Sequence, residues 1–540
     1  MDSANATTRL GRPLALALFL LLTVVSITPI RSYDFFWHLA TGRWIADHHA
    51  LPASDPFSLS SDRVAWVDGE WLFQLGAWGV AAAGGEAAIP IARAIVVAAI
   101  VLAGVLFAAR EAGTGGALFL AAIGLMGASH RLTARPETVA TLLLVLALAV
   151  MLRPITRSSA IALLAIVVVW INVHPSALLA PALAAIAGAG CFVDGTERAR
   201  TECLKRMGLA AAGGIALLAN PWGLEGVLAP LRLAKLAGSG LFVNMEWSAT
   251  RLADFPLIFV VAPAGLVLLV SADDRRALLP RTLVFVALAF LAFRYVRNHG
   301  FFFAALPLLV APAMPRKLPG RVTAIAAAAI LAIVVARQGW IGVGADRAQF
   351  PVASVARLQQ LELKGNVYNP DQLGGYLIWR FYPERRVVTD GRNELHLGWI
   401  REYGKARLDS RAWNALVAKY KLTLAVEEYR RESMDVVDAV TGERKRVPAS
   451  LVYFPRETWA LVAFDDVGLV FARRDAHDAA LIAREEYRTL VPDGAMPLVD
   501  EKPETIELAR REIARARAEL GRSEVVERIA RGLGGGSTEY

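Results

Sequence analysis

The chain contains many apolar runs of the length that crosses a lipid bilayer. A spanning helix needs about 20 mostly apolar residues. Hydrophobic residues make up 55% of the 540 residues, against roughly 45–50% in soluble domains, and the excess is concentrated in runs. About eleven runs approach spanning length, several of them short, at 13–30, 87–109, 115–129, 136–152, 159–173, 176–193, 208–220, 256–272, 281–294, 300–314 and 321–339. The pattern predicts a polytopic α-helical membrane protein.

Basic residues between the runs predict the orientation of the chain, because cytoplasmic loops carry an excess of Lys and Arg. If the N-terminus is inside, the first span follows Arg9 and Arg12 without a cleavage site, and the last 200 residues lie outside. We therefore predict a multi-pass protein of a bacterial inner (plasma) membrane with a cytoplasmic N-terminus. The inside loops then hold Arg153 and Arg157; Arg198, Arg200, Lys205 and Arg206; Arg275, Arg276 and Arg281; and Arg316, Lys317 and Arg321.

The net charge of +9 does not predict a nucleic-acid partner. Much of this charge lies in the loops between apolar runs, and no zinc spacing, phosphate loop or RNA-binding signature accompanies it. Cys191 and Cys203 fall near the cytoplasmic ends of predicted spans, where no disulfide is expected.

Composition divides the chain into three parts. Residues 1–340 form the predicted transmembrane domain and include a long first outer loop at 31–86. Residues 341–480 are more charged and predict an extracytoplasmic mixed α/β domain. Residues 481–540 predict a helical end, with two amphipathic helices at 503–533 joined at Gly521. The stretches of the middle part that read as β-like are GNVYN, GYLIW, RRVVTD, LTLAVEE and GLVFARR.

The first outer loop opens with DFFWHLATGRW at 34–44 and contains the acids Asp34, Asp55, Asp68 and Glu70. A carboxylate at a membrane surface can deprotonate an acceptor hydroxyl, or it can bind a divalent cation such as Mg²⁺ or Mn²⁺. His38 lies four residues after Asp34, on the same face if the stretch is helical. The alternative is structural: Asp34 caps the first span, Asp55 begins a turn, and His38 packs among aromatic rings.

Arginines, histidines and further acids recur in other loops of the same predicted face. Guanidinium groups bind phosphate oxygens in a bidentate manner, and a lipid-phosphate leaving group needs such charge neutralisation. Histidines and acids beside them could position a sugar. The alternative is that the arginines reach interfacial water or pair with loop acids. The residues of this set are Arg131, Arg135, Glu137, His174, Glu246, Arg294, Arg297 and His299.

The stretch DFFWHLATGRWIADHHALPASDPFS, from residue 34 onward, resembles the first outer loop of the GT-C superfamily of polytopic glycosyltransferases. The chain is most similar to bacterial membrane proteins related to oligosaccharyltransferase catalytic subunits and protein mannosyltransferases. The resemblance implies a GT-C-like fold and a catalytic or metal-binding acid at Asp34, with Asp55 as a second.

A second stretch, DQLGGYLIWRFYPERRVVTDGRNELH at 371–396, is similar to the oligosaccharyltransferase segment between a Trp/Asp/Tyr/Gly motif and an Asp-Gly-Asn turn. Asp371, Gly375 and Tyr376 match the first part, and Asp390 and Arg392 flank the later turn. The resemblance implies that Tyr376, Asp390 and Arg392 contact substrate. The paired tryptophans that read an asparagine sequon are absent from this stretch. The alternative here is a Gly-turned hairpin beside the membrane.

These features predict an inverting transfer of a sugar from a polyprenyl-phosphate donor to an envelope lipid, glycan or protein, on the outer face of the membrane. Asp34 would act on the acceptor or hold a cation, and His38, His174 and Glu246 would position the sugar. Arg131, Arg135, Arg294 and Arg297 would bind the lipid phosphate. Two other classes remain open: a non-catalytic membrane scaffold with the same fold, and a transporter. A transporter is expected to place its ionisable groups near mid-membrane.

Overall fold

The computed structural model describes residues 11–62, 64–192, 197–238, 240, 245–315, 320–339, 341–437 and 442–534. Arg9, Arg316, Lys317 and the glycine-rich C-terminal end lie outside these ranges. The chain forms two compact units. The first comprises residues 1–32, 41–51 and 67–344, and the second comprises 33–40, 52–66 and 345–540. Parts of the predicted first outer loop therefore belong to each unit.

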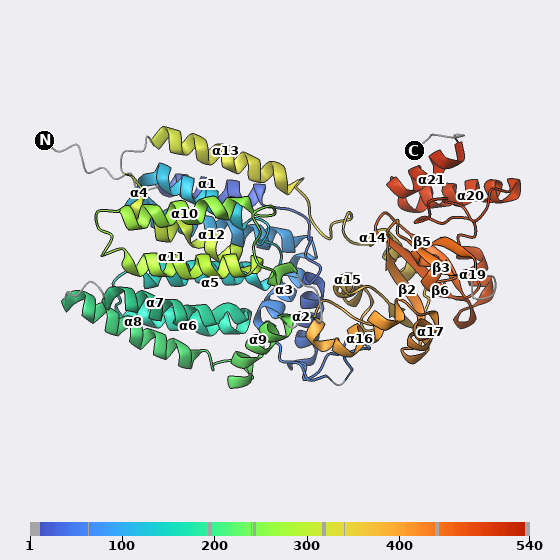
Figure 1. Cartoon of the computed structure of the whole chain (residues 1–540), viewed down its shortest axis with the longest axis horizontal. Helices are drawn as coiled ribbons and strands as arrows, with labels where there is room; N and C mark the ends of the chain where they lie inside the picture. The colour runs from blue at the N-terminus through green and yellow to red at the C-terminus, as the bar shows by residue number, and fades with distance from the viewer. Residues whose placement is uncertain are drawn as a thin grey trace. The chain divides into compact units, whose positions relative to one another are not determined.

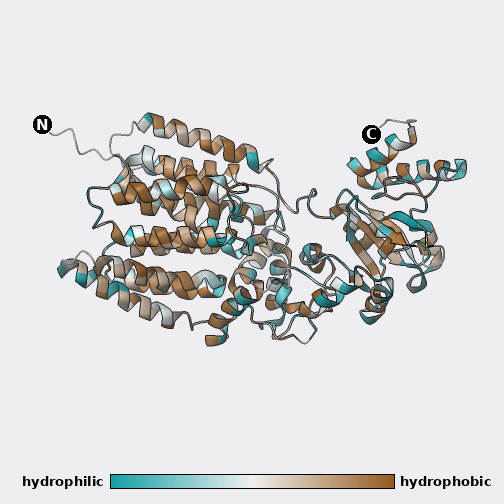
Figure 2. Ribbon diagram, in the orientation of Figure 1, coloured by the Kyte–Doolittle hydropathy of each residue, from teal (hydrophilic) through white to brown (hydrophobic). Residues whose placement is uncertain are grey.

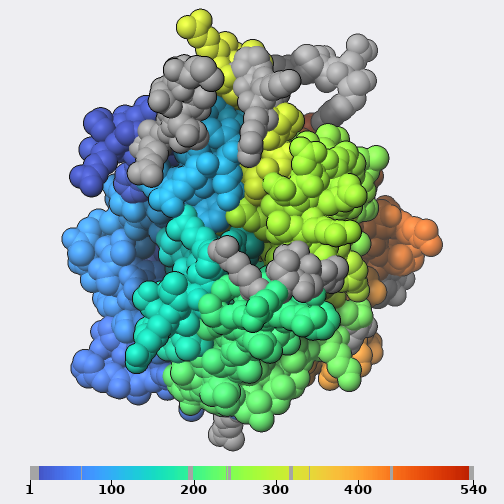
Figure 3. Space-filling view, turned by 90° about the vertical axis from the view of Figure 1, so that its left-hand side faces the viewer, coloured from blue at the N-terminus to red at the C-terminus, as the bar shows by residue number. Residues whose placement is uncertain are grey.

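The first unit is a bundle of helices that lie side by side (Figure 1). Brown, hydrophobic colour follows α7, α10 and α11 along most of their length (Figure 2). Seen along the bundle, segments from the early, middle and late parts of the unit share one end surface (Figure 3). Helix α2 (Phe35–His48) is divided between the two units at residues 40 and 41. The longer helices of the first unit are α1 (Arg12–Val25), α3 (Trp71–Gly84), α4 (Ala88–Ala128), α5 (Pro136–Met151), α6 (Arg157–Val173), α7 (Leu179–Phe192), α8 (Glu197–Ala216), α9 (Leu224–Ala237), α10 (Pro256–Ser271), α11 (Leu279–Arg294), α12 (His299–Val310) and α13 (Gly320–Gln338).

Helix α4 combines two of the predicted spans. Gly113 inside it has φ 68° and ψ 169°, a left-handed conformation that only glycine adopts without strain. The predicted spans 87–109 and 115–129 lie on either side of this residue. The sequence therefore located the break correctly, although the two halves follow each other without a loop.

By length and composition, three helical segments could cross a membrane: Ala88–Ala128, Pro175–Phe192 and Gly320–Arg337. Four shorter apolar helices, Arg12–Val25, Pro136–Met151, Arg157–Val173 and Pro256–Ser271, accompany them. The membrane class is supported by these helices, whereas the number of eleven spans stays a prediction.

Helix α12 occupies the centre of the first unit, because every residue from His299 to Val310 is buried. It lies close against α4, where glycines permit the approach: a Cβ at Gly124 would stand 2.6 Å from the Phe303 carbonyl oxygen. Small residues at helix contacts are how membrane helices achieve dense packing.

The second unit is built on a four-stranded sheet with the order β1–β2–β6–β5. Strands β1 and β2 are parallel, and the other pairs are antiparallel, with Ala425 opposite Phe471. The strands are β1 (Asn366–Tyr368), β2 (Leu422–Glu428), β5 (Trp459–Phe464) and β6 (Gly468–Arg473), with a separate ribbon of β3 (Ser433–Val437) and β4 (Arg444–Pro448). The helices are α14 (Val352–Gln360), α15 (Asp371–Phe381), α16 (Leu397–Ala406), α17 (Ser410–Lys419), α18 (Ala449–Tyr453), α19 (Ala479–Glu485), α20 (Pro503–Leu520) and α21 (Glu524–Gly534).

Three of the predicted β-like stretches are strands: GNVYN contains β1, LTLAVEE is β2 and GLVFARR contains β6. The prediction of β structure for GYLIW was wrong, because this stretch lies within helix α15. Asp371 occupies the first turn of that helix, and Leu373, Gly375 and Leu377 are buried, so tertiary packing overrides the β propensity of its aromatic and branched residues. RRVVTD contributes only isolated bridges at Val387. The two C-terminal helices meet at Gly521, φ 67°, as predicted.

Glu427 on β2 gives the second unit a pH-dependent stability. Burial raises the pKa of its carboxyl from 4.5 to about 7, outweighing hydrogen bonds from the Glu428 amide and Tyr368. Below the unfolded pKa both states hold the proton, and stability is lost as pH rises through the folded pKa. We expect the wild type to lose about 2–3 kcal/mol of stability between pH 5 and 8. Glu427→Gln should remove this slope in thermal unfolding at the two pH values, and an unchanged slope would contradict the assignment.

Candidate functional site

Asp34 immediately precedes helix α2, and its carbonyl accepts the first helical hydrogen bond, from the His38 amide at 3.4 Å. Its carboxylate lies against the turn at Gly391, where a Cβ would stand 2.5 Å from Asp34 Oδ1. Glycine at 391 therefore makes room for the acid. Burial raises the pKa of Asp371, and the negative charges of Asp34 and Asp390 raise it further. Carboxylates from three segments of the second unit, at residues 34, 371 and 390, therefore interact electrostatically with one another.

His38 and Tyr376 are core residues of the second unit. His38 is 2% exposed and its ring centroid lies 3.6 Å from that of Trp37. Tyr376 is 1% exposed, and its ring packs against Phe36 and Phe350. Asp34 stands before the first helical turn rather than within it. The prediction that Asp34 and His38 share one face applied only if both residues were helical, and the helix begins at Phe35.

Asp55 is buried in an ion-paired cluster of the second unit. Arg392 Nη2 lies 3.0 Å from Asp55 Oδ1 and 2.6 Å from Asp390 Oδ2. The other Asp55 oxygen accepts a hydrogen bond from Ser61, and Asp55 Oδ1 also accepts the Phe57 amide at 3.0 Å. Both oxygens of Asp55 are therefore occupied by groups of the chain itself.

Asp390 is held by the same arginine and by two further side chains. Its Oδ1 accepts the Arg392 amide at 2.9 Å and the Arg392 Nε at 2.8 Å, and its Oδ2 accepts Ser58 Oγ at 2.8 Å. His396 Nε2 lies 3.2 Å from Asp390 Oδ2. Burial alone would raise the pKa of Asp390, but the charge of Arg392, followed by His396, holds it well below its usual range.

Asp55, Asp390 and His396 offer ligand atoms within 4.8 Å of one another, so by distance they could hold a metal ion. The chemistry of the donor set does not fit a cation in this arrangement, because the Arg392 guanidinium already lies between the two carboxylates. The metal pair predicted from the sequence was Asp34 with Asp55. The structure instead groups Asp55 with Asp390 and with His396, which the sequence analysis missed although it lies within the 371–396 resemblance.

In the first unit, five of the predicted residues form one ion-pair network. Arg131 pairs with Glu137 and, at 2.9 Å, with Glu246. Arg135 also pairs with Glu246, and Arg297 Nη2 lies 3.1 Å from Glu137 Oε1. Three arginines against two glutamates leave one formal positive charge. The network can therefore attract an anion, although most of its charge is already balanced internally.

The remaining predicted residues of the first unit lie in other contacts. His174 Nε2 is 3.7 Å from Glu70 Oε1, and His299 Nε2 is 2.8 Å from Thr250 Oγ1. Arg294 is exposed and stacks 4.4 Å above the Tyr295 ring. Within the described part of the chain, Arg294 takes no part in the Arg131 network. Arg294 and Arg297, which were predicted to bind the lipid phosphate together, therefore lie in different surroundings: Arg297 belongs to the ion-pair network and Arg294 stacks on Tyr295.

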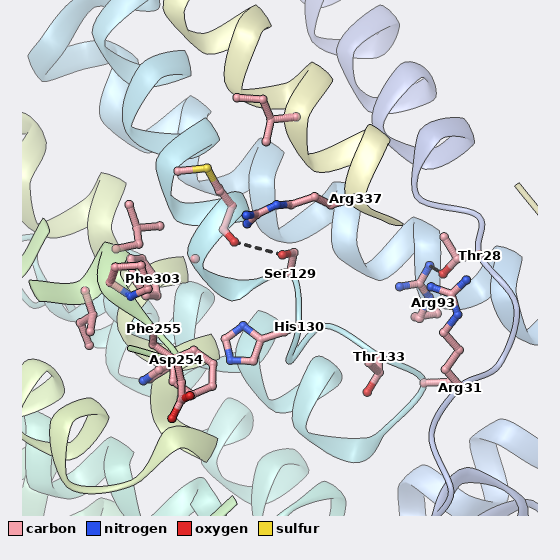
Figure 4. Close-up of a pocket in the computed structure, with 18 of the residues that line it drawn as sticks. Thr28, Arg31, Arg93, Ser129, His130, Thr133, Asp254, Phe255, Phe303 and Arg337 are labelled. Atoms are coloured by element: carbon pink, nitrogen blue, oxygen red, sulfur yellow. Dashed lines mark hydrogen bonds between the residues drawn. The ribbon is translucent and has the colours of Figure 1, made fainter. Parts of the chain in front are cut away.

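A cavity of about 880 Å³ opens in the first unit, and its lining includes His130 and Thr133, which are close in sequence to Arg131 and Arg135 (Figure 4). Its walls are apolar at Phe255, Ile258, Val260, Phe303 and Ile333. Its polar lining residues are Thr28, Arg31, Arg93, Ser129, His130, Thr133, Asp254, His299 and Arg337. A cavity with partly apolar walls and several cationic lining residues suits an amphiphilic anion.

None of the three arginines of the cavity was predicted from the sequence, although the positions of two of them within apolar runs could have indicated a functional role. Arg93 lies within the predicted span 87–109 and Arg337 near the end of span 321–339, and ionisable groups inside apolar spans are costly and usually functional. Arg93 already donates hydrogen bonds within the protein, to the Leu132 carbonyl at 2.8 Å and to Thr28 Oγ1 at 2.9 Å. Arg31 and Arg337 are exposed.

No protein-family model matches the chain, and no curated protein sequence matches it. Solved structures with a similar fold exist. The archaeal oligosaccharyltransferase AglB from Archaeoglobus fulgidus, in complex with an inhibitory peptide and a dolichol-phosphate, has a TM-score of 0.56 at 11% identity, covering 80% of this chain and 74% of that one. The same organism's oligosaccharyltransferase in complex with Zn and sulfate has a TM-score of 0.53 at 11% identity, covering 80% and 73%.

ArnT from Cupriavidus metallidurans, bound to undecaprenyl phosphate, has a TM-score of 0.55 at 15% identity, covering 85% of this chain and 97% of that one. At these identities the likeness concerns the fold. It confirms the fold implied by the resemblance of the first outer loop. The chain shares the fold of these solved structures, and this is the GT-C-like fold that the resemblance implied.

Proposed function

We propose that the chain is an inverting membrane glycosyltransferase that moves a sugar from a polyprenyl-phosphate donor to an envelope lipid, glycan or protein on the outer face of the inner membrane. The observation that carries this proposal is the cavity of the first unit, which combines apolar walls with Arg31, Arg93 and Arg337. Fold relatives bound to dolichol-phosphate and to undecaprenyl phosphate support it.

In this proposal the cavity receives the phosphate and the first isoprene units of the donor. Arginines stabilise the phosphate as the bond to the sugar breaks, because guanidinium groups bind phosphate oxygens with two parallel hydrogen bonds. The Arg131 network, with one uncompensated positive charge, adds to the same attraction. The lipid-phosphate role predicted from the sequence is kept for Arg131, Arg135 and Arg297. The neighbouring acids and histidines position these arginines or the sugar; they are Glu70, Glu137, His174, Glu246 and His299.

The chemical step is proposed for Asp34. Its carboxylate takes the proton of the acceptor hydroxyl, the acceptor oxygen bonds to the anomeric carbon, and the polyprenyl phosphate leaves with the electron pair of the broken bond. Attack opposite the leaving group inverts the anomeric centre. Asp55 and Arg392 support this segment of the second unit rather than react. A Mg²⁺ or Mn²⁺ at Asp34 stays a prediction, and no step here requires it.

Charge reversal in the cavity tests donor binding. We expect the double variant Arg31→Glu, Arg337→Glu to bind undecaprenyl phosphate at least about 10-fold more weakly, because two attractions become repulsions. Binding is measured by tryptophan fluorescence of the detergent-purified protein. Arg232→Glu is the matched control: Arg232 is exposed on α9 and paired with Glu225, so its reversal should leave binding unchanged.

Transfer is then measured with a panel of radiolabelled polyprenyl-phosphate sugars and an extract of envelope acceptors. Label moved by the wild type, and lost in the cavity variant, supports the enzyme. A wild type that binds none of the polyprenyl phosphates rules out this role and favours the scaffold. Binding without transfer of any sugar on the panel also removes the enzymatic assignment.

A further inference from the structure

Arg392 lies at the point where the candidate metal ligands of the second unit converge. The ligand atoms of Asp55, Asp390 and His396 are within 4.8 Å of one another. The guanidinium reaches both carboxylates, at 3.0 and 2.6 Å, and its side chain is only 3% exposed. A buried cation shared by two buried carboxylates performs the charge balance that a bound metal would otherwise supply.

Three aromatic rings fix the guanidinium in this position. Its Cζ lies 4.6 Å from the centroid of the Trp66 ring, 5.1 Å from Trp37 and 5.7 Å from Phe57. Arg392 Nη1 is buried and has no hydrogen-bond partner among the described residues. Ring faces attract cations, and the planar guanidinium stacks on them well.

The contacts join two segments that are far apart in sequence. Asp55, Ser58 and Ser61 come from residues 52–66, whereas Asp390 and Arg392 belong to the turn beside Gly391. Gly391 is the residue against which the Asp34 carboxylate lies. The position of this turn, and with it the surroundings of Asp34, depends on the charge held between Asp55 and Asp390.

We propose that Arg392 is a built-in replacement for a divalent cation, a positioning residue that lets this chain hold Asp55 and Asp390 together without a metal. The wild-type cluster therefore has no need of Mg²⁺, Mn²⁺ or Zn²⁺. Removal of the guanidinium exposes the oxygen and nitrogen donors of Asp55, Asp390 and His396 and converts the cluster into a metal site. This inference does not depend on the proposed sugar transfer, because its test reads folding and metal binding.

The experiment compares the full-length wild type with Arg392→Ala in detergent, each with EDTA or with about 1 mM Mn²⁺, by thermal unfolding. The wild type should unfold within about 1 °C of the same temperature in both buffers. Arg392→Ala should unfold about 5 °C or more below it in EDTA, because two buried carboxylates have lost their partner. Mn²⁺ should restore at least half of that loss, and metal analysis should find one Mn²⁺ per chain in the variant alone.

Two further variants separate this inference from a general loss of stability. The double variant Arg392→Ala, Asp55→Asn removes one donor and should lose the Mn²⁺ response. Arg357→Ala removes another arginine of the same unit, which pairs with Glu485 at 2.5 Å and with Glu519 at 3.6 Å, and should gain no response to Mn²⁺.

Several results overturn the inference. One is a wild type that is stabilised by Mn²⁺ and loses this effect in Asp55→Asn. Another is an Arg392→Ala variant whose unfolding temperature in EDTA equals that of the wild type. An Arg392→Ala chain that folds only with Mn²⁺ supports the replacement, and one that folds in neither buffer shows that a cation cannot take the guanidinium's place.

Discussion

Asp34→Asn is expected to reduce sugar transfer by about 10²–10⁴-fold, the usual contribution of a general base. The asparagine has the same shape, so it fits beside Gly391, where the structure leaves room for the Asp34 side chain, but it cannot take a proton from the acceptor. The thermal unfolding temperature should stay near that of the wild type. Transfer of radiolabel from the polyprenyl-phosphate sugars of the panel measures the loss.

Asp62→Asn is the matched control for this variant. Asp62 also belongs to the second unit, but its side chain is 61% exposed and lies 3.4 Å from Arg386 Nη2. Its substitution should leave transfer within about twofold of the wild type, as expected of an exposed pair. Donor binding should be equal in all three proteins, since Asp34 does not line the cavity of the first unit. Equal transfer by Asp34→Asn and the wild type would exclude Asp34 as the base.

Glu137→Gln should lower the stability of the first unit by about 3–5 kcal/mol, the cost of breaking a buried ion pair. Glu137 is 9% exposed at its side chain and pairs with both Arg131 and Arg297. Its neutralisation removes the carboxylate that pairs with Arg297 and leaves Arg131 paired with Glu246 only. Thermal and denaturant unfolding in detergent measure the loss.

Glu111→Gln provides the comparison, because Glu111 is 29% exposed and pairs with Arg281 at 2.6 Å. That change should cost less than about 1 kcal/mol, as partly exposed pairs contribute little. A cost for Glu137→Gln no larger than for Glu111→Gln would show that the network does not hold the helices together.

The same variant also tests whether the network attracts the donor. Glu137→Gln raises the formal charge of the network by one, so undecaprenyl phosphate should bind more tightly to the folded fraction, by about three- to tenfold. Unchanged binding would restrict the network to a structural role and leave the phosphate to Arg31, Arg93 and Arg337 of the cavity.

The individual elements show why sequence patterns succeeded in the first unit and were less reliable in the second. An apolar run in lipid has to form a helix, because its backbone groups find no other partners there, and each predicted run overlaps a helix among the described residues. The short stretch GYLIW could form a strand or a helix by composition alone. In the folded chain Gly375 packs against the backbone of Tyr33 and against Trp37, and the stretch forms part of helix α15.

Residue types, spacing and hydropathy by themselves indicated the membrane class and the presence of a mixed α/β part. They did not determine which charges meet. Only the tertiary structure brought Arg392 between Asp55 and Asp390, joined Glu137 to two arginines and placed Arg31, Arg93 and Arg337 around one cavity. The physical reason is that helix formation depends on neighbours a few residues apart, whereas an ion pair depends on side chains that the folded chain brings together from as many as 337 positions away.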